Sequence, residues 1–166
     1  CNIPIIVNGI ITGAYGIAKD ITDRIQANKK LEKTLSELER IMDSSMDIIC
    51  VIDEEARFTK INQAALHTWG YQLDELIGKK TLDFIVADDL IMTTRAANKV
   101  IKGKGISNFE NRYKHKNGTV VNMSWSAIWD QKAKCMYVIG RDITEMKKES
   151  RKESRSFKSL RKTIRI

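Results

Sequence analysis

The chain has 166 residues, of which 42% are hydrophobic and 30% are charged, enough for one domain with a buried core plus extensions. Its net charge of +8 is concentrated in residues 145–166, which hold nine Lys and Arg against three Glu. Because the remainder is close to neutral, composition does not indicate a nucleic-acid-binding domain, and we interpret 148–166 as a basic, solvated tail.

Hydrophobic runs and cysteines limit the cellular setting. No run reaches the roughly 18–20 residues that span a bilayer; the nearest, Ile3 to Ala18, contains polar residues and three glycines. Cys1, Cys50 and Cys135 form no C-x-x-C pair, and two of them lie in apolar runs, which is typical of buried free thiols in a reducing compartment. We therefore expect a cytoplasmic protein.

The first residues predict a β-hairpin. Two apolar runs, Ile3 to Val7 and Ile10 to Lys19, flank Asn8-Gly9, a dipeptide that favours a tight hairpin turn. The string Y-G-I-A-K-D-I-T-D at the end of this hairpin recurs as Y-V-I-G-R-D-I-T-E near the end of the chain. Such self-similarity indicates repeated structural units. We interpret residues 1–22 as the last hairpin of a preceding domain, so that the chain is a segment of a longer protein.

Both copies of this string predict a strand that passes directly into a helix. Asp20 and Asp23, and likewise Asp142 and Glu145, have the spacing of a capping box, in which the first side chain accepts from an early helix N–H and the second reaches back to the cap. Acidic side chains there also complement the helix dipole. We expect signal relay through these junctions, at Asp142, Thr144, Glu145, Asp20 and Thr22.

A helical linker is predicted over residues 23–43, in which no Gly or Pro occurs. Hydrophobic residues recur there with heptad spacing, and Asn28 supplies a polar position that would set the register. The pattern predicts a short parallel coiled coil, and hence a homodimer, through a seam of Leu31, Leu35, Leu38 and Met42. The alternative is a helix that packs its apolar face on its own domain.

Residues 44–147 form the main predicted domain. Strands are expected at 47–53, 57–61, 106–115, 119–129 and 133–144, and helices at 62–70, 74–78, 81–86 and 88–103. Asn62 is the expected N-cap of the first helix, and Gly70 ends it. This order predicts an α+β fold in which a five-stranded antiparallel sheet carries short helices on one face.

The strings I-I-C-V-I-D, F-T-K-I-N-Q-A-A, G-Y-Q-L-D-E-L-I-G-K, N-R-Y-K-H-K-N-G-T and V-I-G-R-D-I-T-E together resemble the PAS sensory domain. The resemblance covers residues 38–148, and 1–24 resemble the end of a second PAS domain. It implies a sheet that cups a pocket with its helices, in a cytoplasmic multidomain signalling protein such as a sensor histidine kinase. The chain departs from the family at Ala56, where many members have a turn glycine, and at Ala87, where a proline usually stands.

The expected pocket is lined by residues whose patterns point toward a shared interior. They are Phe58, Leu66, Trp69, Phe84, Ile101, Phe109, Asn111, Tyr113, Met123, Trp125 and Val138. Asn111 is the one polar side chain among them that could orient a ligand. The alternative is a solid core with no ligand.

Cofactors and catalysis are not expected. Haem-binding members that resemble this chain carry a histidine on the long helix, and 88–103 contains none; His67 and His115 are expected at the surface. Flavin-binding light sensors need a reactive cysteine on a short helix, and Thr81 to Phe84 has none. No metal-ligand spacing or catalytic motif occurs, so we expect a non-catalytic regulatory domain whose remaining candidate ligand is an unidentified small molecule.

Two functions therefore stay open. In the first, the domain binds a small molecule and transmits through Asp142-Ile143-Thr144 to the output domain of a sensor histidine kinase. In the second, it is a ligand-free dimerisation and relay domain of a diguanylate cyclase or a transcriptional regulator. The expected partners are a second copy and neighbouring domains of the same parent chain, but neither nucleic acid nor a membrane.

Overall fold

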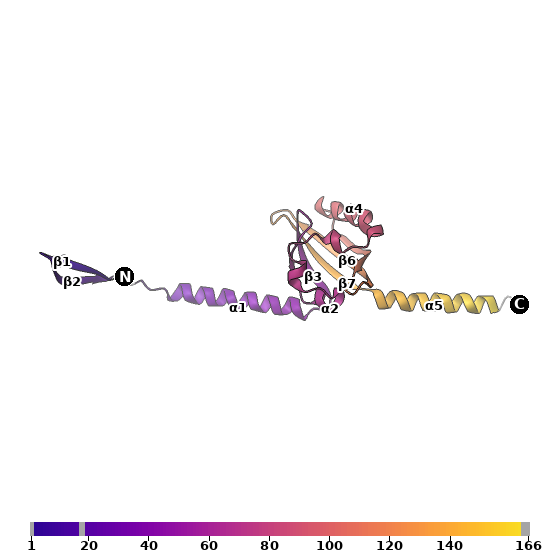
Figure 1. Cartoon of the computed structure of the whole chain (residues 1–166), viewed down its shortest axis with the longest axis horizontal. Helices are drawn as coiled ribbons and strands as arrows, with labels where there is room; N and C mark the ends of the chain where they lie inside the picture. Colours follow the sequence, from indigo (N-terminus) through magenta and orange to yellow (C-terminus); the bar gives the residue numbers. More distant parts are fainter. Residues whose placement is uncertain (1, 17–18, 164–166) are drawn as a thin grey trace. The chain divides into compact units, whose positions relative to one another are not determined.

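The computed structural model describes residues 2–16 and 19–163 (Figure 1). The chain divides into two compact units, residues 1–38 and 39–166. No helix in the described ranges is long and apolar enough to cross a membrane.

The first unit begins with the predicted hairpin. Strand β1 (Asn2–Val7) pairs antiparallel with β2 (Ile10–Gly16), with a register shift between Ile5 and Ile6. Asn8 and Gly9 have φ angles of 53° and 80°, as a type I′ turn requires. The hairpin is confirmed; its membership of a preceding domain stays a prediction.

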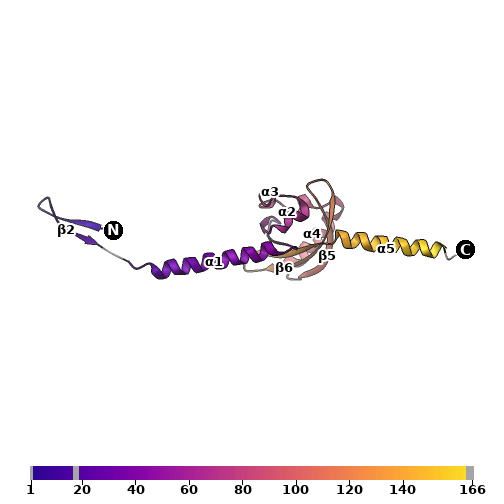
Figure 2. The ribbon, with the colours of Figure 1, turned by 90° about the horizontal axis from the view of Figure 1, so that it is seen from below.

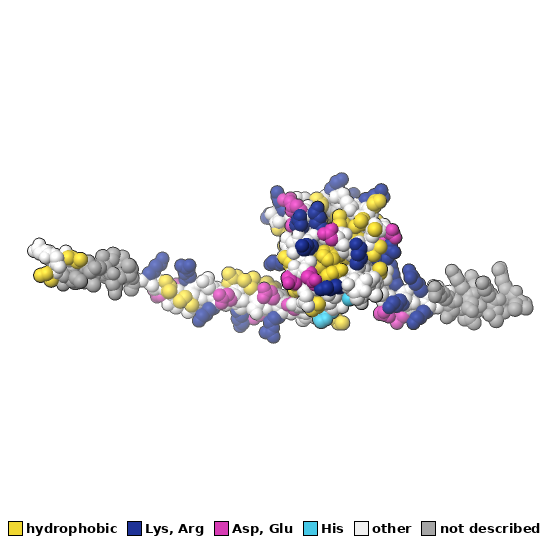
Figure 3. Space-filling view, in the orientation of Figure 1, with side chains coloured by type: hydrophobic (Ala, Val, Ile, Leu, Met, Phe, Trp, Pro, Cys, Tyr) yellow, Lys and Arg dark blue, Asp and Glu magenta, His cyan; other side chains and the backbone are white. Residues whose placement is uncertain are grey.

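Helix α1 (Thr22–Ser44) follows, and the backbone N–H of Thr22 donates to Asp20 Oδ1 at 2.9 Å. Apolar side chains are exposed along this helix among charged ones (Figure 3). Leu31, Leu35 and Leu38 are more than half exposed, whereas Met42 is half-buried. The expected seam is therefore accessible at its three leucines.

The second unit is built on an antiparallel sheet with strand order β4-β3-β7-β6-β5. Its strands are β3 (Ile48–Asp53), β4 (Phe58–Ile61), β5 (Ile106–Lys114), β6 (Val120–Asp130) and β7 (Cys135–Asp142). The helical segments between β4 and β5 lie over one face of this sheet (Figure 2). The predicted fold class is confirmed.

Five short helical segments connect β4 to β5. They are α2 (Ala64–Trp69), α3 (Leu73–Leu76), the 3-10 turns η1 (Thr81–Phe84) and η2 (Ala87–Asp89), and α4 (Leu90–Ile101). Gly70 ends α2 with a φ of 77°, as its position after the last apolar residue predicted.

The core fills the space between the helices and the inner face of the sheet. Alternation along β5 and β6 places Tyr113, Met123 and Trp125 on that face, where all three are buried. Trp69 of α2 stacks on Tyr113, with ring centroids 4.5 Å apart, and is itself fully buried. These aromatic contacts fix the helices over the sheet.

Ala56, which stands where many family members have a glycine, adopts a strained backbone conformation. Its φ of 62° is left-handed, and its N–H donates to the Asp53 carbonyl in the turn between β3 and β4. An L-residue in this conformation is strained by about 1–2 kcal/mol, which explains why glycine suits the position.

One local expectation was wrong, and one segment carried no predicted structure. Asn62 does not cap α2, because its side chain bonds the Ile49 N–H and the Met42 and Asp47 carbonyls instead. The basic tail predicted from residue 148 onward had no assigned secondary structure, and residues 148–163 continue helix α5 (Thr144–Thr163), since no Gly or Pro interrupts the chain there and Lys148 pairs with Glu145.

Candidate functional site

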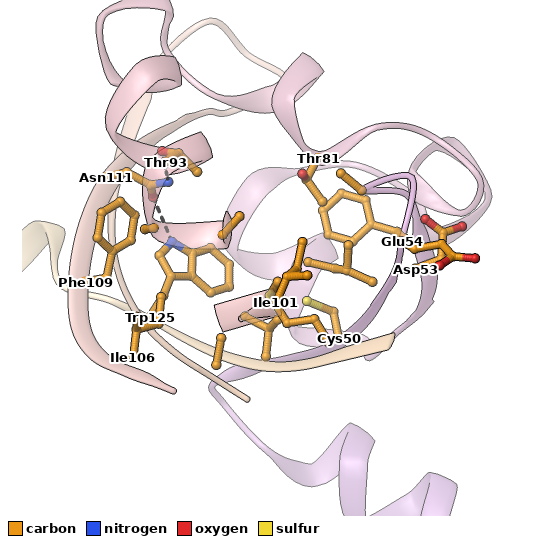
Figure 4. A pocket seen from close by; sticks show the side chains of 18 of the residues that line it. Cys50, Asp53, Glu54, Thr81, Thr93, Ile101, Ile106, Phe109, Asn111 and Trp125 are labelled. Carbon is orange, nitrogen blue, oxygen red and sulfur yellow. Dashed lines mark hydrogen bonds between the residues drawn. The ribbon is translucent and has the colours of Figure 1, made fainter. Parts of the chain in front are cut away.

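A cavity of about 100 Å³ lies between helix α4 and the inner face of the sheet (Figure 4). Its walls come from β3, β5, β6, β7 and α4, and its remaining edge comes from the β3–β4 turn, the start of β4 and η1. Most of the lining side chains are apolar. The site lies where the domain's topology brings these elements together, and it is partly open to solvent.

Several of the residues expected at a pocket lie at this cavity. They are Phe58, Ile101, Phe109, Asn111, Tyr113, Trp125 and Val138.

Four other expected residues do not line it. Trp69 and Met123 are fully buried in the core, with Trp69 covered by the Tyr113 ring. Phe84 packs on Phe58 and Tyr71 instead. Leu66 is only half-buried, because α2 packs through Ala64, Ala65 and Trp69.

The cavity also contains residues that sequence reasoning missed. They are Cys50, Ile52, Asp53, Glu54, Ala56, Thr81, Thr93, Ala96, Ala97, Ile106, Ala127 and Met136. Ala127 and Met136 could have been found by alternation, since they share faces with Trp125 and Val138. No comparable pattern indicated Thr81 or Thr93, which lie on helical segments.

A chain of hydrogen bonds crosses one wall (Figure 4). Asn111 accepts from Trp125 Nε1 at 2.7 Å through Oδ1, and donates through Nδ2 to Thr93 Oγ1 at 3.0 Å. Thr93 in turn donates to the Asp89 carbonyl at 2.8 Å. Asn111 is buried, so this amide ties α4, β5 and β6 to one another at the cavity.

Burial keeps the cavity's titratable inner groups neutral. It raises the pKa of the Cys50 thiol to about 12, and burial likewise raises the pKa of the Tyr113 hydroxyl. Both residues are therefore uncharged near pH 7.

Glu110 and Arg112, on either side of Asn111, face the opposite side of β5. Arg112 bonds Asp89, and Glu110 contacts helix α5. Arg112 donates from Nε and Nη2 to the Asp89 carboxylate at 3.0 Å and 2.7 Å, and its backbone N–H donates to the same carboxylate. The guanidinium holds the pKa of Asp89 below its usual range. Glu110 forms an ion pair with Lys147 in the first turn of α5.

The junction between β7 and α5 is bonded to the sheet. The Thr144 N–H donates to Asp142 Oδ1 at 2.8 Å, and the buried Ile143 donates its N–H to the Asn122 carbonyl at 2.8 Å. Thr144 Oγ1 accepts from the Asn122 N–H at 2.9 Å. Within this described junction Glu145 pairs with Lys148 and does not bond the Asp142 N–H, so only the first half of the expected capping box is present.

Removing the Asp142 cap should destabilise the domain modestly. Asp142→Ala leaves the Thr144 N–H without its acceptor, and the expected loss in free energy of unfolding is about 1 kcal/mol by urea denaturation. Asp142→Asn keeps an acceptor and serves as the control. Equal stability of Asp142→Ala and the unmodified chain would show that the cap contributes nothing.

Comparison with known proteins identifies the class. The family profile described as the PAS fold matches residues 58–141, and the chain belongs to this family. The predicted resemblance is thus confirmed.

Individual relatives point to signalling proteins. Sporulation kinase E of Bacillus subtilis is 30% identical over 82 residues, which are 49% of this chain but only 11% of that kinase. The solved PAS domain of an HTR-like protein from Haloarcula marismortui is 26% identical, with a TM-score of 0.56, covering 72% of this chain and 99% of the other. A domain of a sensory box sensor histidine kinase/response regulator from Geobacter sulfurreducens shares the fold, with a TM-score of 0.58 at 19% identity over 68% of this chain and 96% of that domain. The chain therefore resembles PAS domains of sensor histidine kinases.

Proposed function

We propose that this PAS domain is a cytoplasmic sensory and relay module of a sensor histidine kinase, which binds a small molecule in its cavity and transmits through Asp142-Ile143-Thr144 to α5. The observation that carries the proposal is the position of Asn111. Its side chain forms part of the cavity wall, and the adjacent Glu110 holds Lys147 of α5. A ligand that shifts β5 at Asn111 would therefore also shift the contact to α5.

The resemblance to kinase PAS domains supports the proposed parent protein. The curated relative is a kinase of which this chain matches only 11%, as expected for one sensory module within a larger signalling protein. The alternative, a ligand-free relay domain, leaves the cavity without a role.

A thermal-shift screen against neutral metabolites, organic acids and amines distinguishes the ligand-binding sensor from the ligand-free relay domain. A ligand that binds only the folded domain stabilises it by about 2.7 kcal/mol at a hundredfold excess over Kd. We expect a saturable shift that Asn111→Leu or Phe109→Ala weakens while the variant stays folded. Native mass spectrometry of freshly purified protein would reveal a retained molecule. A screen without any saturable shift would favour the ligand-free relay.

We also propose that α1 joins two copies of the chain. The helix buries none of its residues, and its leucines at heptad spacing lie exposed. An isolated helix gains little stability without such burial, so a second copy is the natural partner for this stripe.

Charging the centre of the seam should therefore separate the copies. Leu35→Glu places two carboxylates in an apolar interface, and we expect the dimer dissociation constant to rise about 100-fold or more by analytical ultracentrifugation. Ser36→Glu adds the same charge one residue outside the seam and should leave the dimer intact. A monomer at high micromolar concentration, or a dimer indifferent to Leu35→Glu, would disprove the seam.

A further inference from the structure

The cavity contains hydroxyl groups that the protein itself leaves unpaired. Thr81 and Tyr113 line it and are each more than nine-tenths buried. Within residues 2–16 and 19–163, neither side-chain oxygen has a hydrogen-bond partner, and the one fully enclosed side-chain N or O atom without a partner is Trp69 Nε1. Because neither oxygen is fully enclosed, the two hydroxyls face the open space of the cavity and are available to bond a molecule there.

Charge is confined to one end of the site. Among the described residues that line the cavity, Cys50 and Tyr113 are uncharged because burial raises the pKa of each, whereas the acidic ones are Asp53 at the end of β3 and Glu54 in the turn after it. Their carboxylates lie at the end of the pocket away from Asn111 and Trp125 (Figure 4). No Lys or Arg is among the described residues that line this cavity, so an anion would meet like charge and find no counter-ion.

The carboxylates themselves are already engaged. Asp53 Oδ1 accepts from the N–H groups of Glu55 and Arg57 at 3.0 Å and 2.8 Å, and Glu54 lies 4.0 Å from Lys134 Nζ. An organic cation would therefore gain little at this end, and its charge would be desolvated further inside without a partner.

Size narrows the ligand further. A dry apolar cavity of about 150 Å³ holds benzene, so about 100 Å³ suits a molecule of roughly four or five non-hydrogen atoms. We infer that the ligand is a small uncharged molecule with an apolar body and one hydroxyl or carbonyl group. Thr81 and Tyr113 recognise that polar group. This inference rests on the sensory function proposed above.

A matched set of probes tests this class. 1-Butanol, butyrate and n-butylammonium share a similar carbon chain and differ in charge, and each is titrated into the full chain while ¹H–¹⁵N NMR shifts are followed. We expect 1-butanol to give saturable shifts at Thr81, Asn111 and Tyr113, and to bind at least tenfold more tightly than either ion.

Two variants test the recognising groups. Thr81→Val and Tyr113→Phe remove only a hydroxyl, so each should weaken the binding of 1-butanol about 3- to 10-fold while the protein stays folded, because neither hydroxyl bonds another described group of the protein. Thr68→Val and Tyr71→Phe change the same residue types outside the cavity and should leave binding unaltered.

The outcomes separate the inference from the function beneath it. Saturable binding of butyrate or n-butylammonium at the same residues, tighter than 1-butanol, would overturn the uncharged class and leave small-molecule sensing standing. If 1-butanol binds with the same affinity to Thr81→Val and to Tyr113→Phe as to the unmodified chain, recognition by these two hydroxyls would be overturned. Absence of saturable shifts from all three probes would count against the sensory function itself.

Discussion

Gly140→Ala should lower the free energy of unfolding by about 2–3 kcal/mol. Gly140 lies on β7 directly opposite Trp125 of β6, and a Cβ there would come within 2.1 Å of the indole ring. The three atoms nearest to that Cβ all belong to the indole, so the indole must move, and it is already packed against Trp69 and Tyr113. Its Nε1–H then loses Asn111 Oδ1, which lies 2.7 Å away at the cavity wall.

Urea denaturation measures this loss, and Gly105→Ala is the matched control. A Cβ at Gly105 would meet the Ala127 carbonyl at 3.4 Å, a tight contact that a small shift relieves, so the expected change is below about 1 kcal/mol. Gly140→Ala should also abolish ligand-induced NMR shifts at Asn111. A Gly140→Ala protein as stable as the unmodified chain would mean that Trp125 is not held where the structure places it.

Asn62→Leu should destabilise the domain by about 3 kcal/mol. The buried amide accepts from the Ile49 N–H at 2.9 Å and donates to the Met42 and Asp47 carbonyls at 2.8 Å and 3.1 Å. Leucine has a similar size but leaves these three backbone groups without their side-chain partner, and each such loss costs about 1–3 kcal/mol where water cannot replace it.

The same substitution should loosen the end of α1. Hydrogen–deuterium exchange over residues 39–47 should accelerate, because the Met42 carbonyl is no longer held to the domain. Asn98→Leu, on α4, replaces an exposed asparagine without a side-chain hydrogen bond and should change stability by less than about 0.5 kcal/mol. Unaltered stability and exchange in Asn62→Leu would show that the hydrogen bonds of the Asn62 side chain do not hold the end of α1 to the domain.

Local patterns were sufficient to predict the fold. Alternation identified the strands, Asn8-Gly9 identified the first turn, and Gly70 marked the end of α2, because each feature depends on a few neighbouring residues. The helical continuation beyond Lys148 was missed, since it lacks an apolar repeat and is supported by propensity and charge pairs.

The site was predicted less completely because periodicity gives the face of a residue and not its depth. Trp69 and Met123 point inward as expected, but other core residues separate them from the cavity. Asn62 has the sequence context of a helix cap, yet a longer-range set of bonds to Ile49 and Met42 competes successfully for its side chain. Such competition depends on tertiary contacts that local spacing does not contain.

The central claim, that a ligand in the cavity is sensed at α5, is tested most directly by hydrogen–deuterium exchange with and without saturating 1-butanol. The account predicts altered exchange in both β5 and residues 144–154, with residues 2–16 unchanged as the internal reference. Glu110→Gln removes the ion pair with Lys147 and should reduce the change in 144–154 while that in β5 persists. Exchange that changes at β5 but never at 144–154 in the unmodified chain would contradict the proposed relay.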